Sequence, residues 1–324
     1  MTAPLLCIVG PTAVGKTALS IALAQATHAE VVSADASQIY QGLDIGTGKV
    51  TADEMGDVPH HLIDVVRPDE AFDAQRYIAL ADAAIAEIRG RGRPVIVCGG
   101  TGLYIRALIH GLCPAPPVDD AIRAEIQAQI AQGELPVLHA ALAEADPEAA
   151  RRIAPADRQR IERALGVFRT TGRTLSAWQA EHRFAEHRHQ AVFLGLNMER
   201  PQLNDRIDRR AQAMFEGGLV DEVARLEAAG YGAALRSMSA IGYRYAAEVH
   251  HGTLTKARAI ELTARDTRRY AKRQVTWFKA LEGVMWHTPP VQIVPLLKSL
   301  GAAGWPAGTV SDGIDEISAE ETSV

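Results

Sequence analysis

The stretch LLCIVGPTAVGKTALSIALAQA, residues 5–26, decides the fold. Its first part, LLCIVG (5–10), is a short apolar run ending in glycine, which is typical of a buried strand. The part that follows is rich in Ala, Leu and Ile at helical spacing and predicts a helix. Between them, GPTAVGKT (10–17) fits the pattern GxxxxGK[ST] where a strand turns into a helix. This order indicates an α/β domain.

Residues 10–17 are therefore predicted to form a phosphate-binding loop, the P-loop. Its glycines let the backbone curl so that amide N–H groups point inward, and the helix N-terminus adds partial positive charge. Lys16 is expected to reach phosphate oxygens, and Thr17 to ligate Mg2+. The pattern leaves the phosphate compound open: ATP, GTP or another diphosphate ester. The predicted diphosphate-binding residues are Gly10, Pro11, Thr12, Ala13, Val14, Gly15, Lys16 and Thr17.

Three further segments extend the α/β pattern. EVVSAD (30–35), PVIVCGG (94–100) and HQAVFLGLN (189–197) predict buried strands, and residues 74–90 between the first two predict a helix. Strand, helix and strand in this order imply a parallel sheet. The predicted fold class is α/β, a P-loop NTPase-like parallel sheet flanked by helices, with an inserted all-helical domain.

The insertion begins at a change of texture. CPAPPVDD (113–120) is a proline-rich connector, and the next 65 residues or so carry only helical patterns, broken by Gly and Pro. Residues 1–113 and 189–290 are thus predicted to form a discontinuous P-loop catalytic core around a helical insertion at 114–188. Further helices are predicted at 201–230 and 255–281. Residues 291–324 are predicted to be a C-terminal tail that is partly disordered, above all in its last dozen residues.

Composition excludes several classes. The chain has 324 residues, 47% hydrophobic and 23% charged, without an apolar run long enough to span a membrane, so a cytoplasmic protein with no membrane partner is expected, as is a monomer. Its three isolated cysteines lack zinc-site spacing. The net charge of −5 comes from five acids in the last 14 residues, whereas seven Arg crowd 151–173 and six Lys or Arg crowd 265–279. Basic surfaces for a nucleic acid therefore remain available.

One acid stands at the end of a strand near the P-loop. Nucleotide hydrolases carry a second strand ending in Asp, but VIVCGGTG (95–102) has no acid. Asp35 instead ends EVVSAD, so it is a candidate base for an acceptor nucleophile. The alternative is that Asp35 only caps the segment that follows it. Thr101 stands in the turn after the third strand, where a threonine can cap a strand-to-helix turn.

Seven motifs together strongly resemble the bacterial tRNA dimethylallyltransferase (isopentenyl-transferase) family across about residues 4–288. They are GPTAVGKT (10–17), SADASQIYQGLDIGTGKV (33–50), PHHLIDV (59–65), GGTGLYIRAL (99–108), DRQRIERAL (157–165), AIGYR (240–244) and TRRYAKRQVTWF (267–278). The resemblance implies a transferase that moves the dimethylallyl group from dimethylallyl diphosphate to the N6 amine of the adenosine immediately 3′ of the anticodon. The tRNAs would be those that read codons starting with U, and diphosphate would be released.

The resemblance also implies roles for residues. Lys16 and the loop amides would neutralise the leaving diphosphate with Mg2+ held by Thr17, and Asp35 would accept the amino proton. The catalytic set is Asp35, Thr101 and Lys16, and Asp44 is read as a loop acid near the site. Because the target adenine must leave its stack, the enzyme needs cationic and stacking side chains.

The resemblance and the basic segments assign tRNA contacts to both the catalytic core and the insertion, and the insertion is expected to bind the anticodon stem. The roles of Arg206 and Arg209 stay open, because these arginines could either bind the diphosphate or form ion pairs with nearby acids. The family commonly has Ser where this chain has Ala36, and Gln or Arg where it has Ser239. The predicted tRNA-binding residues are Asp35, Ala36, Ser37, Gln38, Thr101, Arg123, Gln159, Arg160, Ile161, Glu162, Arg163, Gly242, Tyr243, Arg244, Arg269, Lys272, Arg273, Gln274 and Trp277.

Two alternatives remain open. An adenylate isopentenyltransferase would use the same loop and base on free AMP, although a free nucleotide needs no separate helical insertion. A P-loop kinase would consume ATP without a prenyl donor.

Overall fold

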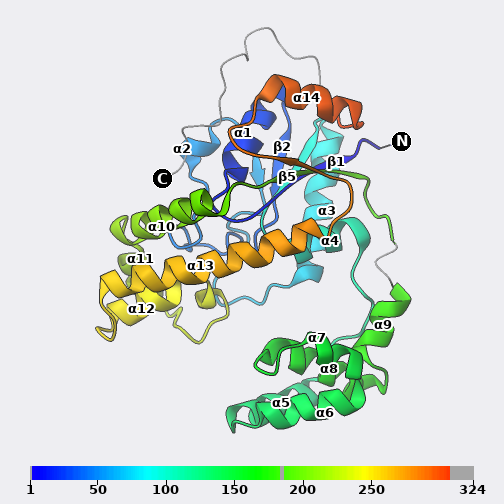
Figure 1. Ribbon diagram of the computed structural model, residues 1–324, viewed down its shortest axis with the longest axis vertical. Helices are drawn as coiled ribbons and strands as arrows, with labels where there is room; N and C mark the ends of the chain where they lie inside the picture. The colour runs from blue at the N-terminus through cyan, green and yellow to red at the C-terminus, as the bar shows by residue number, and fades with distance from the viewer. Residues whose placement is uncertain (1, 183–185, 307–324) are drawn as a thin grey trace. The chain divides into compact units, whose positions relative to one another are not determined.

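A six-stranded parallel sheet forms the centre of the larger of two structural units (Figure 1). The computed structural model describes residues 2–182 and 186–306. The strands follow the order β3-β2-β4-β1-β5-β6, and every pair is parallel. Their bounds are β1 Leu5–Val9, β2 Glu30–Ser33, β3 His60–His61, β4 Val95–Cys98, β5 Ala191–Leu196 and β6 Val284–His287. The four strands predicted from sequence are confirmed, whereas β3 and β6, which form the two edges of the sheet, were not predicted.

The sheet is buried on both faces. In β1, Leu5 and Cys7 belong to one core cluster, and Leu6 and Ile8 belong to another, as the alternation of side chains along a strand requires. The first cluster includes helices α3 (Ala74–Gly90) and α4 (Gly102–His110), and the second includes α1 (Lys16–Thr27). Because all strand pairs are parallel, the carboxyl ends of the strands lie at one edge of the sheet, and ligands bind at this edge in folds of this kind.

The segment after residue 290 is not simply a tail. Helix α14 (Ile293–Ala302) packs against α1, and its Leu296 and Leu300 are buried in the second cluster together with Trp305. The prediction of a tail from residue 291 is therefore wrong for 293–305, because four apolar side chains of α14 face the sheet. The predicted disorder of the last dozen residues falls outside the described residues.

The remaining helices of this unit lie near the carboxyl edge. Helix α10 (Arg200–Glu216) packs against the long α13 (Lys256–Lys279), and α11 (Leu219–Ala228) packs against α12 (Tyr243–His250) (Figure 1). The helix predicted at 201–230 is divided between α10 and α11, because Gly218 adopts a left-handed φ of 99°. Two short helices, α2 (Ala52–Met55) and η1 (Ser237–Ser239), complete the unit.

The first unit comprises Met1–Ile109 and His189–Val324, and the second unit covers His110–Arg188. In its described residues the second unit has helices and no strand. Its helices are α5 (Asp120–Ala131), α6 (Leu135–Ala145), α7 (Pro147–Arg152), α8 (Arg158–Thr171) and α9 (Leu175–His182). Asp119, Asp146 and Asp157 each cap the helix that follows, accepting backbone N–H bonds. Leu142 and Ile161, both 0% exposed, lie in a separate small core.

No helix in the described part of the chain is long and apolar enough to cross a lipid bilayer.

Candidate active site

The P-loop turns sharply between β1 and α1. Gly10 has φ 145° and Gly15 has φ 103°, conformations that glycine adopts without strain, and Ala13 shares the left-handed region with φ 64°. A Cβ on Gly10 would overlap the backbone oxygen of Leu196. Gly15 is the N-cap of α1, so the loop closes on the helix N-terminus, which is the arrangement that binds phosphate.

The half-buried Lys16 lies with its ammonium against the backbone of the P-loop. Its Nζ donates a hydrogen bond to the carbonyl oxygen of Pro11 at 2.7 Å. Burial lowers the pKa of Lys16 from its ordinary value of 10.5 to about 8, while Cys98 and Asp35 act to raise it and Arg210 acts to lower it. A desolvated cation in an electropositive loop is well suited to a polyphosphate anion.

Asp35 lies directly after β2 and close enough to affect Lys16 electrostatically. Its Oδ1 accepts backbone N–H bonds from Ser37 at 2.8 Å and from Gln38 at 3.3 Å. Asp35 therefore does cap the turn that follows it, as the alternative reading of the sequence held. Both of these bonds use Oδ1, so Oδ2 can accept a hydrogen bond from a substrate.

Thr101 joins the ends of β2 and β4. Its Oγ1 accepts the N–H of Ala36 at 3.0 Å, and its own N–H donates to the Ala34 carbonyl at 3.1 Å. Tyr270 of α13 hydrogen-bonds to Thr101 and Gln274, and burial raises the pKa of Tyr270 to about 12. The Tyr270 hydroxyl is thus a neutral hydrogen-bonding group beside Thr101.

Gln274 holds the P-loop to the turn after β4. Its Oε1 accepts the N–H of Thr12 at 2.8 Å, and its Nε2 donates to the Gly100 carbonyl at 3.0 Å. The side chain is only 5% exposed. The prediction that Gln274 contacts tRNA is therefore wrong for its side chain, because both ends of the amide are occupied by the protein.

Two arginines one turn apart on α10 flank the P-loop, and only one was among the candidates. A Cβ on Gly15 would lie 3.7 Å from the Arg206 guanidinium. Arg210 was missed; its guanidinium donates to the carbonyls of Thr47 and Gly48, and burial lowers its pKa although the charge of Asp35 opposes this. The i, i+4 spacing of the two arginines was the available signal.

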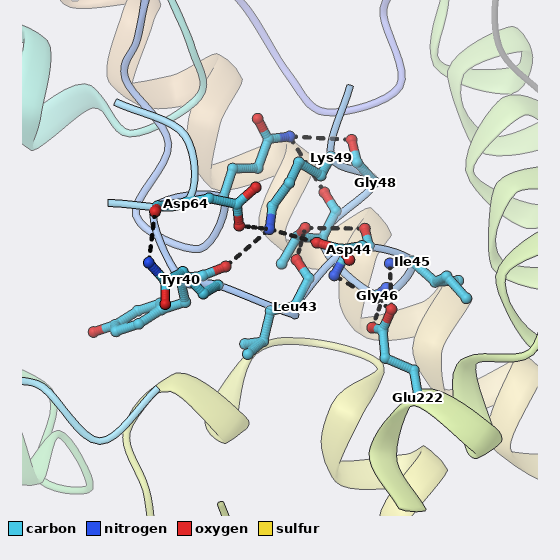
Figure 2. A network of polar contacts seen from close by, with 12 residues as sticks. Tyr40, Leu43, Asp44, Ile45, Gly46, Gly48, Lys49, Asp64 and Glu222 are labelled. Atoms are coloured by element: carbon cyan, nitrogen blue, oxygen red, sulfur yellow. Dashed lines mark hydrogen bonds and ion pairs between the residues drawn. The ribbon is translucent and has the colours of Figure 1, made fainter. Parts of the chain in front are cut away.

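The loop of residues 43–49, which we call the Asp44 loop, contacts Arg210 and is drawn in Figure 2. Asp44, predicted to be an acid near the site, is exposed and pairs with Lys49 at 2.6 Å; Lys49 also binds Asp64 and donates to the Tyr40 carbonyl. Gln38 donates to the Gly48 carbonyl at 3.1 Å. Asp44 thus shapes the loop through Lys49.

The predicted tRNA contacts of the larger unit divide by exposure. Arg244, Arg269 and Arg273 line an open cavity of about 250 Å³ with Gly242, and Lys272 is exposed beside it on α13. Tyr243 is 0% exposed and its hydroxyl donates to Glu222, so the prediction that its side chain contacts tRNA is wrong.

Trp277 has a different setting on the same helix. It is half-buried, with the Arg106 guanidinium 4.7 Å from its ring centroid, and a Cβ on Gly102 would overlap its indole. Trp277 therefore lies beside the turn that carries Thr101.

The predicted contacts of the helical unit also differ in exposure. Gln159 and Arg160 are exposed on the first turn of α8, whereas Ile161 belongs to the core of the unit and cannot contact a ligand with its side chain. Arg123 pairs with Glu162 at 3.7 Å. Arg163 is held by two backbone carbonyls of the proline-rich connector, those of Ala115 and Pro116, each at 2.8 Å.

The P-loop carries one side-chain oxygen of the kind that Mg2+ can use beside substrate phosphates. Within residues 2–182 and 186–306, the group of three side chains that could hold a metal is Glu227, His250 and His251, on α11 and α12 and outside the P-loop. Mg2+ usually keeps several waters and needs only one or two protein oxygens beside substrate phosphates. The Thr17 hydroxyl in the first turn of α1 is such an oxygen.

Comparisons with known proteins identify the family of this chain. The family model described as IPP transferase matches residues 38–281. A curated tRNA dimethylallyltransferase of Anaeromyxobacter dehalogenans strain 2CP-C is 50% identical over 88% of this chain and 95% of its own. That of Geobacter sulfurreducens is 47% identical over 87% and 91%.

Solved structures are similar as well. The tRNA isopentenylpyrophosphate transferase of Bacillus halodurans aligns with a TM-score of 0.65 at 41% identity, covering 89% of this chain and 90% of that one. A eukaryotic dimethylallyltransferase acting on tRNA aligns with a TM-score of 0.74 at 27% identity, covering 89% and 74%. With a P-loop, a strand-end carboxylate and relatives matched over most of its length, this chain belongs to the IPP transferase family.

Proposed function

We propose that this chain transfers the dimethylallyl group of dimethylallyl diphosphate to the N6 amine of the adenosine immediately 3′ of the anticodon, in tRNAs that read codons starting with U. The observation that carries the proposal is the placement of Asp35, which follows β2, close to Lys16, which follows β1, at the carboxyl edge of the sheet, in a chain matched along most of its length by tRNA dimethylallyltransferases. Such a site has a cation for a leaving diphosphate and a base across from it.

The donor end of the reaction requires charge stabilisation. When the allylic C–O bond breaks, the bonding electrons leave with the diphosphate, and Lys16 with the inward N–H groups of the P-loop neutralises them. Arg210 adds a second half-buried cation whose charge acts on Lys16. Mg2+ bound at Thr17 would supply further charge neutralisation on the diphosphate.

The acceptor end requires a base. The adenine N6 lone pair is delocalised into the ring, so the nitrogen is a poor nucleophile until its proton is drawn away. In our proposal Asp35 Oδ2 accepts this proton as the new C–N bond forms, while Oδ1 stays bound to Ser37 and Gln38. Thr101 orients the segment that carries Asp35 through its bond to Ala36.

The tRNA surface in this proposal has two parts. On α13 and α12, the exposed Arg244, Arg269, Lys272 and Arg273 provide cations for backbone phosphates. On α8, Gln159 and Arg160 serve the anticodon stem. We expect the enzyme to act as a monomer in the cytoplasm, which size-exclusion chromatography and cell fractionation would test.

Nucleoside analysis tests the proposed reaction. Unmodified tRNA with adenosine 3′ of the anticodon is incubated with dimethylallyl diphosphate and Mg2+, then digested and analysed by mass spectrometry. The expected product is N6-dimethylallyladenosine, and Asp35→Ala should lower its rate of formation by about 10²–10⁴-fold while inorganic diphosphate still binds. Unimpaired transfer by Asp35→Ala would exclude this residue as the base.

The same assay separates the alternatives. Transfer to free AMP is not favoured, because the relatives that match this chain are tRNA enzymes. Faster labelling of AMP than of tRNA would nevertheless replace tRNA as the acceptor. ATP consumption in the absence of a prenyl donor would instead indicate a P-loop kinase.

A further inference from the structure

A buried carboxylate on α11 holds the Asp44 loop from outside the P-loop (Figure 2). Glu222 is 3% exposed. Its Oε2 accepts the N–H groups of Ile45 at 2.9 Å and Asp44 at 3.3 Å, and its Oε1 accepts the N–H of Gly46 at 3.4 Å. The Tyr243 hydroxyl donates to Oε1 at 2.6 Å. Four donors therefore surround one buried carboxylate, and three of them belong to the loop.

The other side of the same loop faces the candidate active site. The carbonyl of Gly48 accepts from Gln38 at 3.1 Å and from Arg210 at 3.3 Å, and the Thr47 carbonyl accepts from both at longer distances. Gln38 is itself bound through its backbone N–H to the carboxylate at the end of β2. Two consecutive carbonyls thus hold a half-buried arginine and a polar side chain beside the site.

We propose that Glu222 is a positioning residue for the prenyl-transfer site. By fixing the N–H groups of the Asp44 loop, it fixes the carbonyls that hold Arg210 next to Lys16 and Gln38 next to Asp35. The inference rests on the proposed function for its kinetic consequence, but the placement of Arg210 at a diphosphate cradle can be measured by binding alone.

Variants of Glu222 differ in how many loop contacts they remove. Glu222→Leu leaves three N–H groups of the loop without their acceptor, one of them buried, so the loop is expected to pull away from α11. Glu222→Gln can turn its oxygen to Ile45 and Asp44 and its amide NH₂ to the Tyr243 hydroxyl, and it should retain part of the function. Tyr243→Phe keeps the loop bonds and should have the smallest effect.

Gly46 provides an independent way to displace the loop. A Cβ on Gly46 would overlap the Tyr243 ring and lie 2.8 Å from Cδ1 of Leu219. Gly46→Ala should therefore push the loop off α11 and α12 while leaving the Glu222 carboxylate intact. If Glu222→Leu does not fold, Gly46→Ala carries the same test. Asp221→Asn, at an exposed acid next to Glu222 on α11, is the matched control.

The experiment combines binding, kinetics and hydrogen exchange below the unfolding temperature of each variant. For Glu222→Leu and Gly46→Ala we expect about tenfold weaker binding of Mg2+–inorganic diphosphate by calorimetry, since small displacements of binding groups cost this much. The KM for dimethylallyl diphosphate should rise with it, kcat should fall, and amide exchange in residues 43–49 should accelerate. Glu222→Gln should recover part of each loss, and Asp221→Asn should match the wild type.

The outcomes separate the two proposals. A purely structural role for Glu222 predicts a lower melting temperature with unchanged diphosphate affinity, KM and kcat in the folded variants, and that result would overturn the inference. A wild-type protein that binds diphosphate but transfers no prenyl group contradicts the proposed function instead, and the binding and exchange arms still decide the role of Glu222.

Discussion

Replacing Gln274 by Leu removes one side chain that closes the P-loop against the turn after β4. In the native protein its amide satisfies the N–H of Thr12 and the carbonyl of Gly100, and it is almost completely buried. Leucine has a similar volume but neither a donor nor an acceptor, so both backbone groups would lose their partner. A buried polar group without a partner costs about 1–3 kcal/mol, so the loss of two partners should lower the free energy of unfolding by about 2–6 kcal/mol.

The loss has a functional component as well. Thr12 lies within the P-loop, and its N–H is held in one orientation by Gln274, so we expect Gln274→Leu to weaken binding of inorganic diphosphate by about tenfold. Urea unfolding followed by circular dichroism measures the first effect, and calorimetry measures the second. Thr276→Ala, at an exposed position on the same helix, is the control that should leave both unchanged.

A specific result would refute this reasoning. If Gln274→Leu unfolds at the same urea concentration as the wild type and binds diphosphate equally well, the two backbone groups do not depend on Gln274. If instead tRNA affinity alone falls, Gln274 contacts the nucleic acid, as the sequence pattern had suggested.

Two further predictions follow from other groups. Because burial lowers the pKa of Lys16 to about 8, the ammonium of the free protein loses its proton as the pH rises through 8, and kcat/KM for the donor should fall above that pH. Between about pH 8 and 10.5 the unfolded chain binds the Lys16 proton more tightly, so the Lys16 contribution to the free energy of unfolding should increase with pH; a donor profile that stays flat to pH 9.5 would contradict the assignment. In the helical unit, Ile161→Ala should lower the free energy of unfolding by about 2–4 kcal/mol in a denaturant titration, whereas its exposed neighbour Arg160→Ala should reduce tRNA affinity without that loss. Equal stability of the two variants would place Ile161 outside the core.

The sequence pattern predicted the features whose physical cause is local. The P-loop needs glycine conformations, a lysine and a helix N-terminus within eight consecutive residues, and all of them are present between Gly10 and Thr17. The four central strands are buried on both faces, so each is an apolar run that can be recognised by itself. The helices of the insertion have their own caps, and Asp119 and Asp157 stand immediately before α5 and α8.

The edges of the fold were harder to predict. β3 has two residues, and β6 pairs only because β5 presents a free edge to it. Helix α14 follows two prolines, and its burial depends on α1, which lies more than 260 residues earlier in the chain. Each of these elements forms against a partner surface, and the local spacing of apolar residues does not indicate that surface.

By itself, therefore, the sequence determined that the protein has a P-loop on a parallel sheet, a carboxylate at the end of another strand, and a separate helical unit. Only the tertiary structure decided what the long-range side chains do. The motif around α13 is polar along much of its length, yet Gln274 faces the P-loop and Arg273 faces solvent. Glu222 and Tyr243 both contact Gly46 of the Asp44 loop, although they lie 176 and 197 residues after it in the sequence. The role of a helix face depends on what packs against it, and only the tertiary structure shows that.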